Sequence, residues 1–338
     1  MPVRRPRALL AMDPELLPRL LDDASARRLQ EVAELDVELV ADDFARPEVA
    51  AALAQAEVLL TFWGAPAVDA RALAAAPRLK AVVHAAGSVK DFVTEACWDR
   101  GITVSSAAPA NSVPVAEYTV AMVLLANKCV MQLREEYRSV RGRHHDWHQR
   151  YGHAGNYRRI VGIVGASRIG RRVIELLRPY DLELLVYDPY LSDHQATALG
   201  TRRVGLDELC RISDVVSLHA PALPETRAMI DRRRLALMRD GATLINTARG
   251  SLVDGAAVTD ELASGRLHAV IDVTDPEILP ADSPLYDLPN VLLTPHIAGS
   301  LGNELHRMAG SAIEEIARYA AGLPFMHAVR REDLNHTA

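Results

Sequence analysis

The sequence predicts an α/β protein built from two doubly wound parallel-sheet domains. Its 338 residues correspond to about two domains at roughly 150 residues each. Short runs rich in β-branched residues alternate with helical patterns, which is typical of βαβ units around a parallel sheet. This alternation starts afresh at Ile160, after a long helical pattern and a polar stretch. We therefore expect one sheet in the first third of the chain and a second sheet from Ile160 onward.

The expected elements follow from these runs. The strands expected in the first third are Ala8–Met12, Asp36–Val40, Glu57–Leu60, Lys80–His84 and Ile102–Val104. Those expected later are Ile160–Val164, Leu182–Tyr187, Asp214–Leu218, Ala242–Asn246, Ala269–Val273 and Val291–Thr294. Between the two sets we expect one helix over about Ser112–Arg141, with Asn111 or Ser112 as its N-cap, and then a polar excursion, Arg141–Arg159. A last helix, Asn303–Ala321, has no expected strand after it and should pack on the first domain.

The composition excludes several classes of protein. Apolar residues make up 49% and charged residues 24%, which is ordinary for a globular chain. The net charge of −6 offers no basic surface for nucleic acid or for an anionic membrane, so neither partner is expected. The apolar stretch Tyr118–Ala126 is far shorter than the ~20 residues of a membrane helix, and the N-terminus lacks the apolar segment of a secretory signal. Three scattered cysteines predict a reduced, cytoplasmic protein.

The sharpest local pattern is an apolar strand, Ile160–Val164, that runs directly into Gly165 and then a helix. Gly165 allows a tight turn, Gly170 lets the helix pack closely on the sheet, and the helix N-terminus offers N–H groups to a pyrophosphate. Ser167 stands where the middle glycine of a GxGxxG motif would be. Asp188 ends the next strand, where a carboxylate accepts hydrogen bonds from an adenosine ribose and disfavours a 2′-phosphate. The pattern predicts NAD rather than NADP; the alternative is a glycine turn that binds no ligand.

Three further segments follow later strands, at the carboxyl ends where open α/β sheets bind ligands. They carry Arg249, Asp272 with Glu277, and His296. Taken singly, Arg249 could be a surface ion-pair partner, Glu277 a solvated loop residue and His296 a packed turn histidine. Together they supply a cation for a carboxylate, a proton donor or acceptor, and an acid that tunes it. Hydride transfer at a 2-hydroxy or 2-keto acid needs this set.

Several motifs occur in a fixed order: AAGSVKDF, RGITVSSAAPANSVPVAEY, VGIVGASRIGR, SLHAPALPETRAMI, LINTARGSLVD, DVTDPEILP and LTPHIAGS. With them the sequence resembles the D-isomer-specific 2-hydroxyacid dehydrogenase family, which includes glyoxylate/hydroxypyruvate reductases and phosphoglycerate dehydrogenases. The resemblance runs from about Leu79 to Leu323. It implies a Rossmann NAD-binding domain, residues 109–301, inserted in a flavodoxin-like substrate domain made of residues 1–108 and 302–338.

The resemblance also implies catalytic roles. Arg249, in the NTARG motif, would bind the substrate carboxylate and polarise the 2-oxo oxygen. His296 would give or take the proton on that oxygen while hydride moves between the nicotinamide and C2. Glu277 would pair with the imidazole, favouring its charged form and fixing its orientation. Asp275 is the less favoured choice for this acid, although Ile278 stands where the family usually has a proline.

The remaining site residues come from the same motifs. The implied cofactor contacts are Gly165, Ser167, Arg168, Ile169, Gly170, Asp188, Ala220, Pro221, Thr247 and Asp272. The substrate carboxylate would also meet backbone N–H groups at Gly87 and Ser88. His219 is expected to be structural or to face the cofactor. The resemblance further implies a homodimer, with the Ser112–Arg141 helix and the polar excursion as the places for its interface.

Three features depart from the family pattern. Ser167 replaces a glycine, which bears on cofactor affinity but not on where the cofactor binds. Lys90 stands where many relatives have an aspartate, and it either binds a second anionic group of the substrate or points to solvent. Four histidines crowd the polar excursion: His144, His145, His148 and His153. Because they lack the helical spacing of a zinc motif, we expect no metal there; the segment could instead line the active site.

The leading hypothesis is an NAD-dependent oxidoreductase acting on a small 2-hydroxy or 2-keto acid. A dinucleotide-sensing, corepressor-like binding protein would share the architecture, but the short polar tail after Leu323 leaves little for such a role. A dehydrogenase of the same fold with a phosphite-type substrate is a further alternative. Glu277 argues against formate, because formate dehydrogenases carry glutamine at that position. The particular 2-hydroxy acid is left open.

Overall fold

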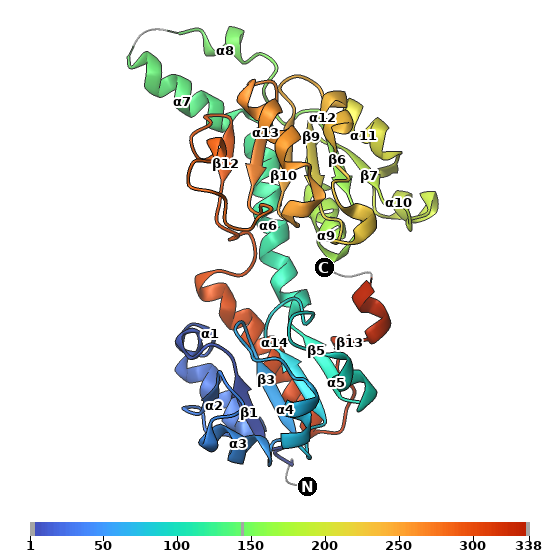
Figure 1. Ribbon diagram of the computed structural model, residues 1–338. Coiled ribbons are helices and arrows are strands. Elements are labelled where there is room, and N and C mark those ends of the chain that lie inside the picture. Colours follow the sequence, from blue (N-terminus) through green and yellow to red (C-terminus); the bar gives the residue numbers. More distant parts are fainter. Residues whose placement is uncertain (1–3, 143–144, 336–338) are drawn as a thin grey trace. The chain divides into compact units, whose positions relative to one another are not determined.

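The computed structural model describes residues 4–142 and 145–335, which fold into two compact units (Figure 1). Unit 1 runs up to Ser112 and resumes at Ser300, whereas unit 2 spans Val113–Gly299. Each unit contains one sheet with an apolar core on both of its faces. Two doubly wound α/β units confirm the predicted fold class.

The sheet of unit 1 has the strand order β13-β5-β4-β3-β1-β2, in which only the β13–β5 pair is antiparallel. Its strands are β1 Ala8–Ala11, β2 Val40–Ala41, β3 Val58–Thr61, β4 Ala81–His84, β5 Thr103–Ser106 and β13 Ala328–Val329. Its helices are α1 Leu17–Leu20, α2 Asp23–Val32, α3 Pro47–Leu53, α4 Ala70–Ala75, α5 Glu95–Asp99 and α14 Leu305–Ala320. The order β2-β1-β3-β4-β5 is that of flavodoxin-like folds.

The sheet of unit 2 has the order β12-β11-β10-β9-β6-β7-β8, and all of its strand pairs are parallel. Its strands are β6 Ile160–Val164, β7 Glu183–Tyr187, β8 Arg202–Arg203, β9 Val215–Leu218, β10 Thr243–Asn246, β11 His268–Ile271 and β12 Val291–Leu293. Its helices are α7 Val130–Val140, α8 Trp147–Arg150, α9 Arg168–Leu177, α10 Asp193–Ala198, α11 Leu206–Ile212, α12 Arg232–Leu237 and α13 Gly255–Ala263. Read from β8 to β11, the order is the Rossmann one with β6 as the first strand.

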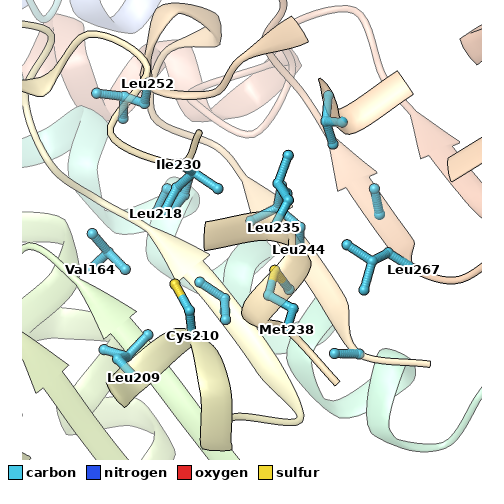
Figure 2. Close-up of a cluster of buried hydrophobic side chains, with 14 of the residues drawn as sticks. Val164, Leu209, Cys210, Leu218, Ile230, Leu235, Met238, Leu244, Leu252 and Leu267 are labelled. Carbon is cyan, nitrogen blue, oxygen red and sulfur yellow. The ribbon is translucent and has the colours of Figure 1, made fainter. Parts of the chain in front are cut away.

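Side chains along the central strands of unit 2 point alternately to the two faces of the sheet, and they contribute to an apolar core on each face. On one face Leu218 of β9 and Leu244 of β10 pack against Leu209 and Leu235 of helices α11 and α12 (Figure 2). Neighbouring strand residues such as Ile245 belong to the core of the opposite face. Because both faces are covered, these strands read as nearly continuous apolar runs, and the sequence pattern located them correctly.

The predicted helix over Ser112–Arg141 is wrong in two respects. It begins earlier, so that Asn111 and Ser112 lie inside α6 (Ala108–Asn127) and neither is its N-cap. It also ends at a break: Cys129 has a left-handed backbone (φ 51°) and α7 starts after it. Within the described residues no single helix has the length and apolar character to span a membrane, although α6 and α7 would pass that test together across their 51° bend.

Two short strands also differ from the prediction. Most of the expected strand Asp36–Val40 is a turn, because the carboxylate of Asp36 accepts a hydrogen bond from the Glu38 amide (3.0 Å) and draws the backbone away from the sheet. The last helix, α14, packs on α1 and α2 of unit 1. The expected absence of a strand after it is wrong, because β13 pairs with β5.

The carboxylate of Glu315 holds this C-terminal strand. Glu315 lies on the buried face of α14 with 2% of its surface exposed. Its two oxygens accept hydrogen bonds from the amides of Met326 (3.0 Å) and His327 (2.7 Å), just before β13. A buried ion that is paired in this way fixes the segment, because leaving it unpaired would be costly.

We predict that Glu315→Ala lowers the free energy of unfolding by about 2 kcal/mol, because two charge-assisted hydrogen bonds are lost. The neighbouring Glu314 is exposed, so Glu314→Ala is the matched control and should change stability little. Urea denaturation followed by tryptophan fluorescence measures both variants. Equal stability of the two would contradict the anchoring role.

Candidate active site

The residues singled out in unit 2 lie beyond the carboxyl ends of six of its strands: β6, β7, β9, β10, β11 and β12. Because these strands are parallel, their carboxyl ends share one edge of the sheet. Open α/β sheets bind ligands at this edge. The topology therefore brings together segments that are far apart in the sequence.

The turn after β6 requires glycine at two positions. Gly165 has φ 98°, and a Cβ there would lie 2.7 Å from the amide nitrogen of Ala220. A Cβ on Gly170 would lie 2.0 Å from the carbonyl oxygen of Gly165. No side chain fits at either position, so the backbone at this edge stays bare, as contact with a pyrophosphate requires.

Ser167, in contrast, occupies a position that does not need glycine. Its backbone (φ −63°, ψ 178°) is accessible to any L-residue. Its hydroxyl oxygen accepts a hydrogen bond from the Gly170 amide (3.3 Å) and so caps α9. Serine is a favoured N-cap residue. The departure from the glycine motif therefore has a local structural explanation.

Asp188, Arg168 and Ile169 surround the same turn. The Asp188 carboxylate accepts hydrogen bonds from the amides of Ala166 (2.7 Å) and Tyr190 (2.8 Å), which holds it beside the turn. Each carboxylate oxygen keeps a lone pair for a ribose hydroxyl. Arg168 is the first residue of α9, and burial lowers the pKa of its guanidinium. Ile169 packs against the apolar core.

His219 and Ala220 close the turn from the side of β9. The His219 ring is buried, its Nε2 lies 2.9 Å from the Ser217 hydroxyl, and burial lowers the pKa of the imidazole to about 3. The ring is therefore neutral and unsuited to acid–base chemistry near neutral pH. Its buried Nδ1 has no hydrogen-bond partner within the described part of the chain. The turn at Gly165 exposes its backbone, and His219 beside it has a buried nitrogen without a hydrogen-bond partner in the described part of the chain. Both features suit the binding of a dinucleotide.

A buried carboxylate organises the loop after β12. Asp272, 2% exposed, accepts hydrogen bonds from the Thr294 hydroxyl (2.7 Å), the Ile297 amide (2.8 Å) and the Ala298 amide (2.9 Å). Its own carbonyl oxygen accepts from the His296 amide (2.9 Å). These bonds hold the loop on both sides of His296. Asp272 thus positions the catalytic candidate, besides any contact with a cofactor.

His296 and Glu277 form the pair that the sequence suggested. His296 Nδ1 lies 2.5 Å from Glu277 Oε1, and about half of each side chain is exposed. The backbone of His296 is left-handed (φ 55°), a conformation that costs a non-glycine residue about 1–3 kcal/mol. Asp275 instead pairs with Arg227 (3.4 Å), so the carboxylate beside the imidazole is that of Glu277. Nε2 is the ring nitrogen that faces away from this pair.

Arg249 lies in a turn that Asn246 shapes. The Asn246 side chain accepts from the Ala248 amide (3.1 Å) and donates to the Arg249 carbonyl oxygen (2.9 Å). A Cβ on Gly250 would lie 2.0 Å from the carbonyl carbon of Thr274. The turn with Arg249 therefore packs directly against the loop that carries Glu277. Asn246 and Gly250 belong to the NTARG motif, but the motif alone indicates no role for either of them.

Helix α6 supports the loops of Arg249 and His296 through hydroxyl groups that no sequence motif predicted. Thr119 Oγ1 lies 3.1 Å from Thr247 Oγ1, and the Tyr118 hydroxyl lies 3.1 Å from Thr294 Oγ1. Burial raises the pKa of Tyr118, and the nearby charge of Asp272 raises it further. These partners are 128 and 176 residues apart in sequence, so no local pattern predicts them.

In unit 1, the predicted substrate loop follows β4. Gly87 and Ser88 come after His84, whose ring is buried and whose Nδ1 lies 3.0 Å from the Thr61 hydroxyl. Burial lowers the pKa of His84 to about 4, so this residue supports the loop as a neutral group. The Ser88 hydroxyl accepts a hydrogen bond from the Lys90 amide (3.3 Å).

The histidines of the polar excursion are spread along it. His144 lies outside the described residues. The His145 ring contacts Trp147, with centroids 4.7 Å apart, and His153 Nε2 lies 3.9 Å from Cys129 Sγ. Across residues 4–142 and 145–335, no group of three or more His, Cys, Asp or Glu side chains could hold a metal ion.

The strand order of unit 2 and the residues at the carboxyl ends of its strands define its class: a Rossmann domain of a dinucleotide-dependent dehydrogenase. A family profile described as "D-isomer specific 2-hydroxyacid dehydrogenase, NAD binding domain" matches residues 120–298, more than half of the chain. The chain therefore belongs to the D-isomer-specific 2-hydroxyacid dehydrogenase family, and the resemblance found in its motifs is confirmed. NAD is the cofactor of this domain.

Individual proteins similar to this chain are dehydrogenases of the same family. The D-3-phosphoglycerate dehydrogenase of Mycobacterium tuberculosis is 35% identical over 284 residues, 83% of this chain and 52% of the relative. The chain thus spans about half the length of such curated relatives. The D-mandelate dehydrogenase of Rhodotorula graminis superposes with a TM-score of 0.77 at 26% identity, covering 97% of this chain and 98% of that one. D-Lactate dehydrogenase from Aquifex aeolicus, solved with NAD and lactic acid, gives 0.70 at 26% identity, covering 93% and 95%.

We predict that Gly250→Ala destabilises the protein by about 2–3 kcal/mol, or roughly 5–10 °C in Tm, because the new Cβ would overlap the backbone of Thr274. Gly255→Ala is the matched control, since a Cβ there meets only the Asp275 carbonyl oxygen, at 3.9 Å. Calorimetry compares the two variants. The same Tm for both would show that the two loops are not in close contact.

Proposed function

We propose that the protein is an NAD-dependent oxidoreductase that interconverts a small D-2-hydroxy acid and its 2-keto acid. The observation that carries this proposal is the 2.5 Å contact between His296 and Glu277 at the carboxyl edge of the Rossmann sheet. The turn of Arg249 packs against the Glu277 loop beside it. Arginine, acid and imidazole are thereby assembled in one unit, next to the predicted dinucleotide turn.

The chemistry follows from these groups. NADH, when bound, supplies the hydride that reduces C2 of the keto acid. Arg249 binds the substrate carboxylate with a planar guanidinium that suits its two oxygens. His296 donates a proton from Nε2 to the 2-oxo oxygen, or removes it in the oxidation direction. Glu277 accepts a hydrogen bond from Nδ1, which fixes the orientation of the ring and leaves Nε2 for the substrate.

In this proposal one unit binds the cofactor and the other unit contributes to binding the substrate. The central part of the chain, about residues 109–301, binds the cofactor through Gly165, Ser167, Asp188 and their neighbours. Residues 1–108 and 302–338 form the substrate domain, and backbone N–H groups at Gly87 and Ser88 add to the binding of the substrate carboxylate. The relatives are named for phosphoglycerate, mandelate and lactate, which supports the 2-hydroxy acid class for this chain.

We also propose that the protein acts as a homodimer in the cytoplasm. Support for a dimer comes from apolar side chains exposed along the end of α6 and along α7: Leu125 (42%), Val130 (40%) and Tyr137 (66%). Exposed apolar residues that cluster on one segment commonly mark an interface. The three cysteines are all free thiols, which suits a reducing compartment.

We predict that NADH is oxidised with at least one of glyoxylate, hydroxypyruvate, pyruvate, or branched or aromatic 2-keto acids. His296→Asn should lower kcat/KM by about 10²–10⁴-fold. Asparagine tolerates the left-handed backbone of this position, so the loss would report on the imidazole. Arg249→Ala should also abolish most of the turnover.

The matched control is His194→Asn, an exposed histidine on α10, which should retain wild-type turnover. Absorbance at the NADH band measures all variants, with phosphite tested in the direction of NAD reduction. Turnover of phosphite alone, or full activity of His296→Asn, would contradict the proposed reaction.

We predict a preference for NADH over NADPH, because the carboxylate of Asp188 would repel a 2′-phosphate. Asp188→Ser should raise the ratio of kcat/KM for NADPH to that for NADH by about tenfold or more. Asp181→Ser, at the turn before β7, is the control and should leave the ratio unchanged. Equal use of both cofactors by the wild-type protein would disprove the preference.

A further inference from the structure

An exposed tryptophan lies at the carboxyl edge of the unit 1 sheet. Trp63 is the second residue after β3, and 44% of its surface is exposed. Strand β3 lies between β1 and β4 in this sheet (Figure 1). Open α/β sheets bind ligands at the carboxyl ends of their strands, and tryptophan is on average one of the more buried residues. A large aromatic side chain that stays exposed at this edge is therefore a candidate for contact with a ligand.

Trp63 is next to the loop that we propose for binding the substrate carboxylate. Strands β3 and β4 pair in parallel up to their last residues, and the carbonyl oxygen of Thr61 accepts a hydrogen bond from the Ala85 amide (2.8 Å). The two loops therefore leave the sheet side by side, about 4.8 Å apart. The loop after β3 carries Trp63, and the loop after β4 carries Gly87 and Ser88. An indole ring is long enough to reach a substrate bound at the neighbouring loop.

The surroundings of Trp63 hold it in place before any ligand binds. The Asp13 amide donates a hydrogen bond to the Trp63 carbonyl oxygen (3.0 Å). Gly64 has φ 77°, and a Cβ there would lie 2.8 Å from Asp13 Cβ, so the loops after β1 and β3 are in direct contact. The indole packs on the buried ring of Phe62, with centroids 4.4 Å apart. A side chain that is already ordered loses little entropy when it binds a ligand.

The charges at this edge disfavour a second anionic group on the substrate. The loop after β1 carries two acids, Asp13 and Glu15, and residues 62–68 after β3 carry no charge. In the loop after β4, Lys90 is followed directly by Asp91, so the two add no net charge. A phosphate or a distal carboxylate beside Trp63 would meet more negative than positive charge. An apolar substituent suits this edge better.

We propose that Trp63 contacts the side chain of the substrate, the part that begins at C3, and that the protein prefers 2-keto acids with a branched or aromatic side chain. This inference rests on the proposed function, because it takes Gly87 and Ser88 as the binding site of the carboxylate. The indole buries the apolar surface of such a side chain, and contact between two rings stabilises an aromatic one further. Glyoxylate has no C3 and makes no such contact.

The test compares kcat/KM for phenylpyruvate, 4-methyl-2-oxopentanoate, glyoxylate and 3-phosphohydroxypyruvate, followed by NADH absorbance. The wild-type protein should use one of the first two at least tenfold more efficiently than the phosphorylated acid. Trp63→Ala should lower kcat/KM for that preferred acid by about 10–100-fold and change the value for glyoxylate less than about twofold. Trp63→Phe keeps a ring and should retain most of the preference.

Tyr180→Ala is the matched control. Tyr180 is exposed to a similar extent (42%) and lies before β7, at the amino end of the unit 2 strands, so its replacement should change no substrate. Retained turnover of glyoxylate and an unchanged Tm verify that Trp63→Ala is folded.

Two kinds of failure are distinguishable. The phosphorylated acid or glyoxylate as the best substrate would overturn the role of Trp63 and leave the proposed reaction standing. So would an unchanged preference in Trp63→Ala, or an equal loss for all four acids. If the wild-type protein turned over no 2-keto acid, the proposed function and this inference would both be overturned.

Discussion

The geometry of the candidate active site depends on the buried carboxylate of Asp272. Three hydrogen bonds from the loop after β12 converge on it, and it lies at the carboxyl end of β11, between the strands β10 and β12. Because a buried carboxylate without hydrogen bonds would be very unfavourable, these bonds stabilise the conformation of the loop after β12. They also explain how His296 keeps a left-handed backbone, since a strained residue persists only where its surroundings determine its conformation.

The turn that carries Arg249 is positioned by contact with the loop after Asp272, and helix α6 contacts both this turn and the loop that carries His296. Gly250 brings the turn of Arg249 against the backbone after Asp272. Tyr118 and Thr119 of α6 bond to one residue of each catalytic loop. Glu277 then needs only to reach across a short distance to the imidazole. A rigid frame with exposed reactive groups is the arrangement that positioned acid–base catalysis requires.

The sequence predicted the parallel strands and the residues at their ends, because buried parallel strands are continuous apolar runs and their carboxyl ends share one edge. It did not predict β8 or β13, which have two residues each and exist because a neighbouring strand offers hydrogen bonds. Nor did it predict the break at Cys129, since no glycine or proline marks that left-handed residue. The supporting contacts of Tyr118 and Asn246 were also missed, because they depend on the tertiary fold.

Ser167 shows how a motif and its physical requirement can differ. In a GxGxxG sequence all three glycines look equivalent, yet the reasons for them are separate. Here Gly165 and Gly170 are enforced by overlap of a Cβ with backbone atoms, whereas Ser167 has an ordinary extended backbone. The middle position is the N-cap of α9, and a serine there satisfies an amide that glycine would leave to solvent. The serine therefore caps the start of the helix that we propose for pyrophosphate binding, and the shape of the turn is kept.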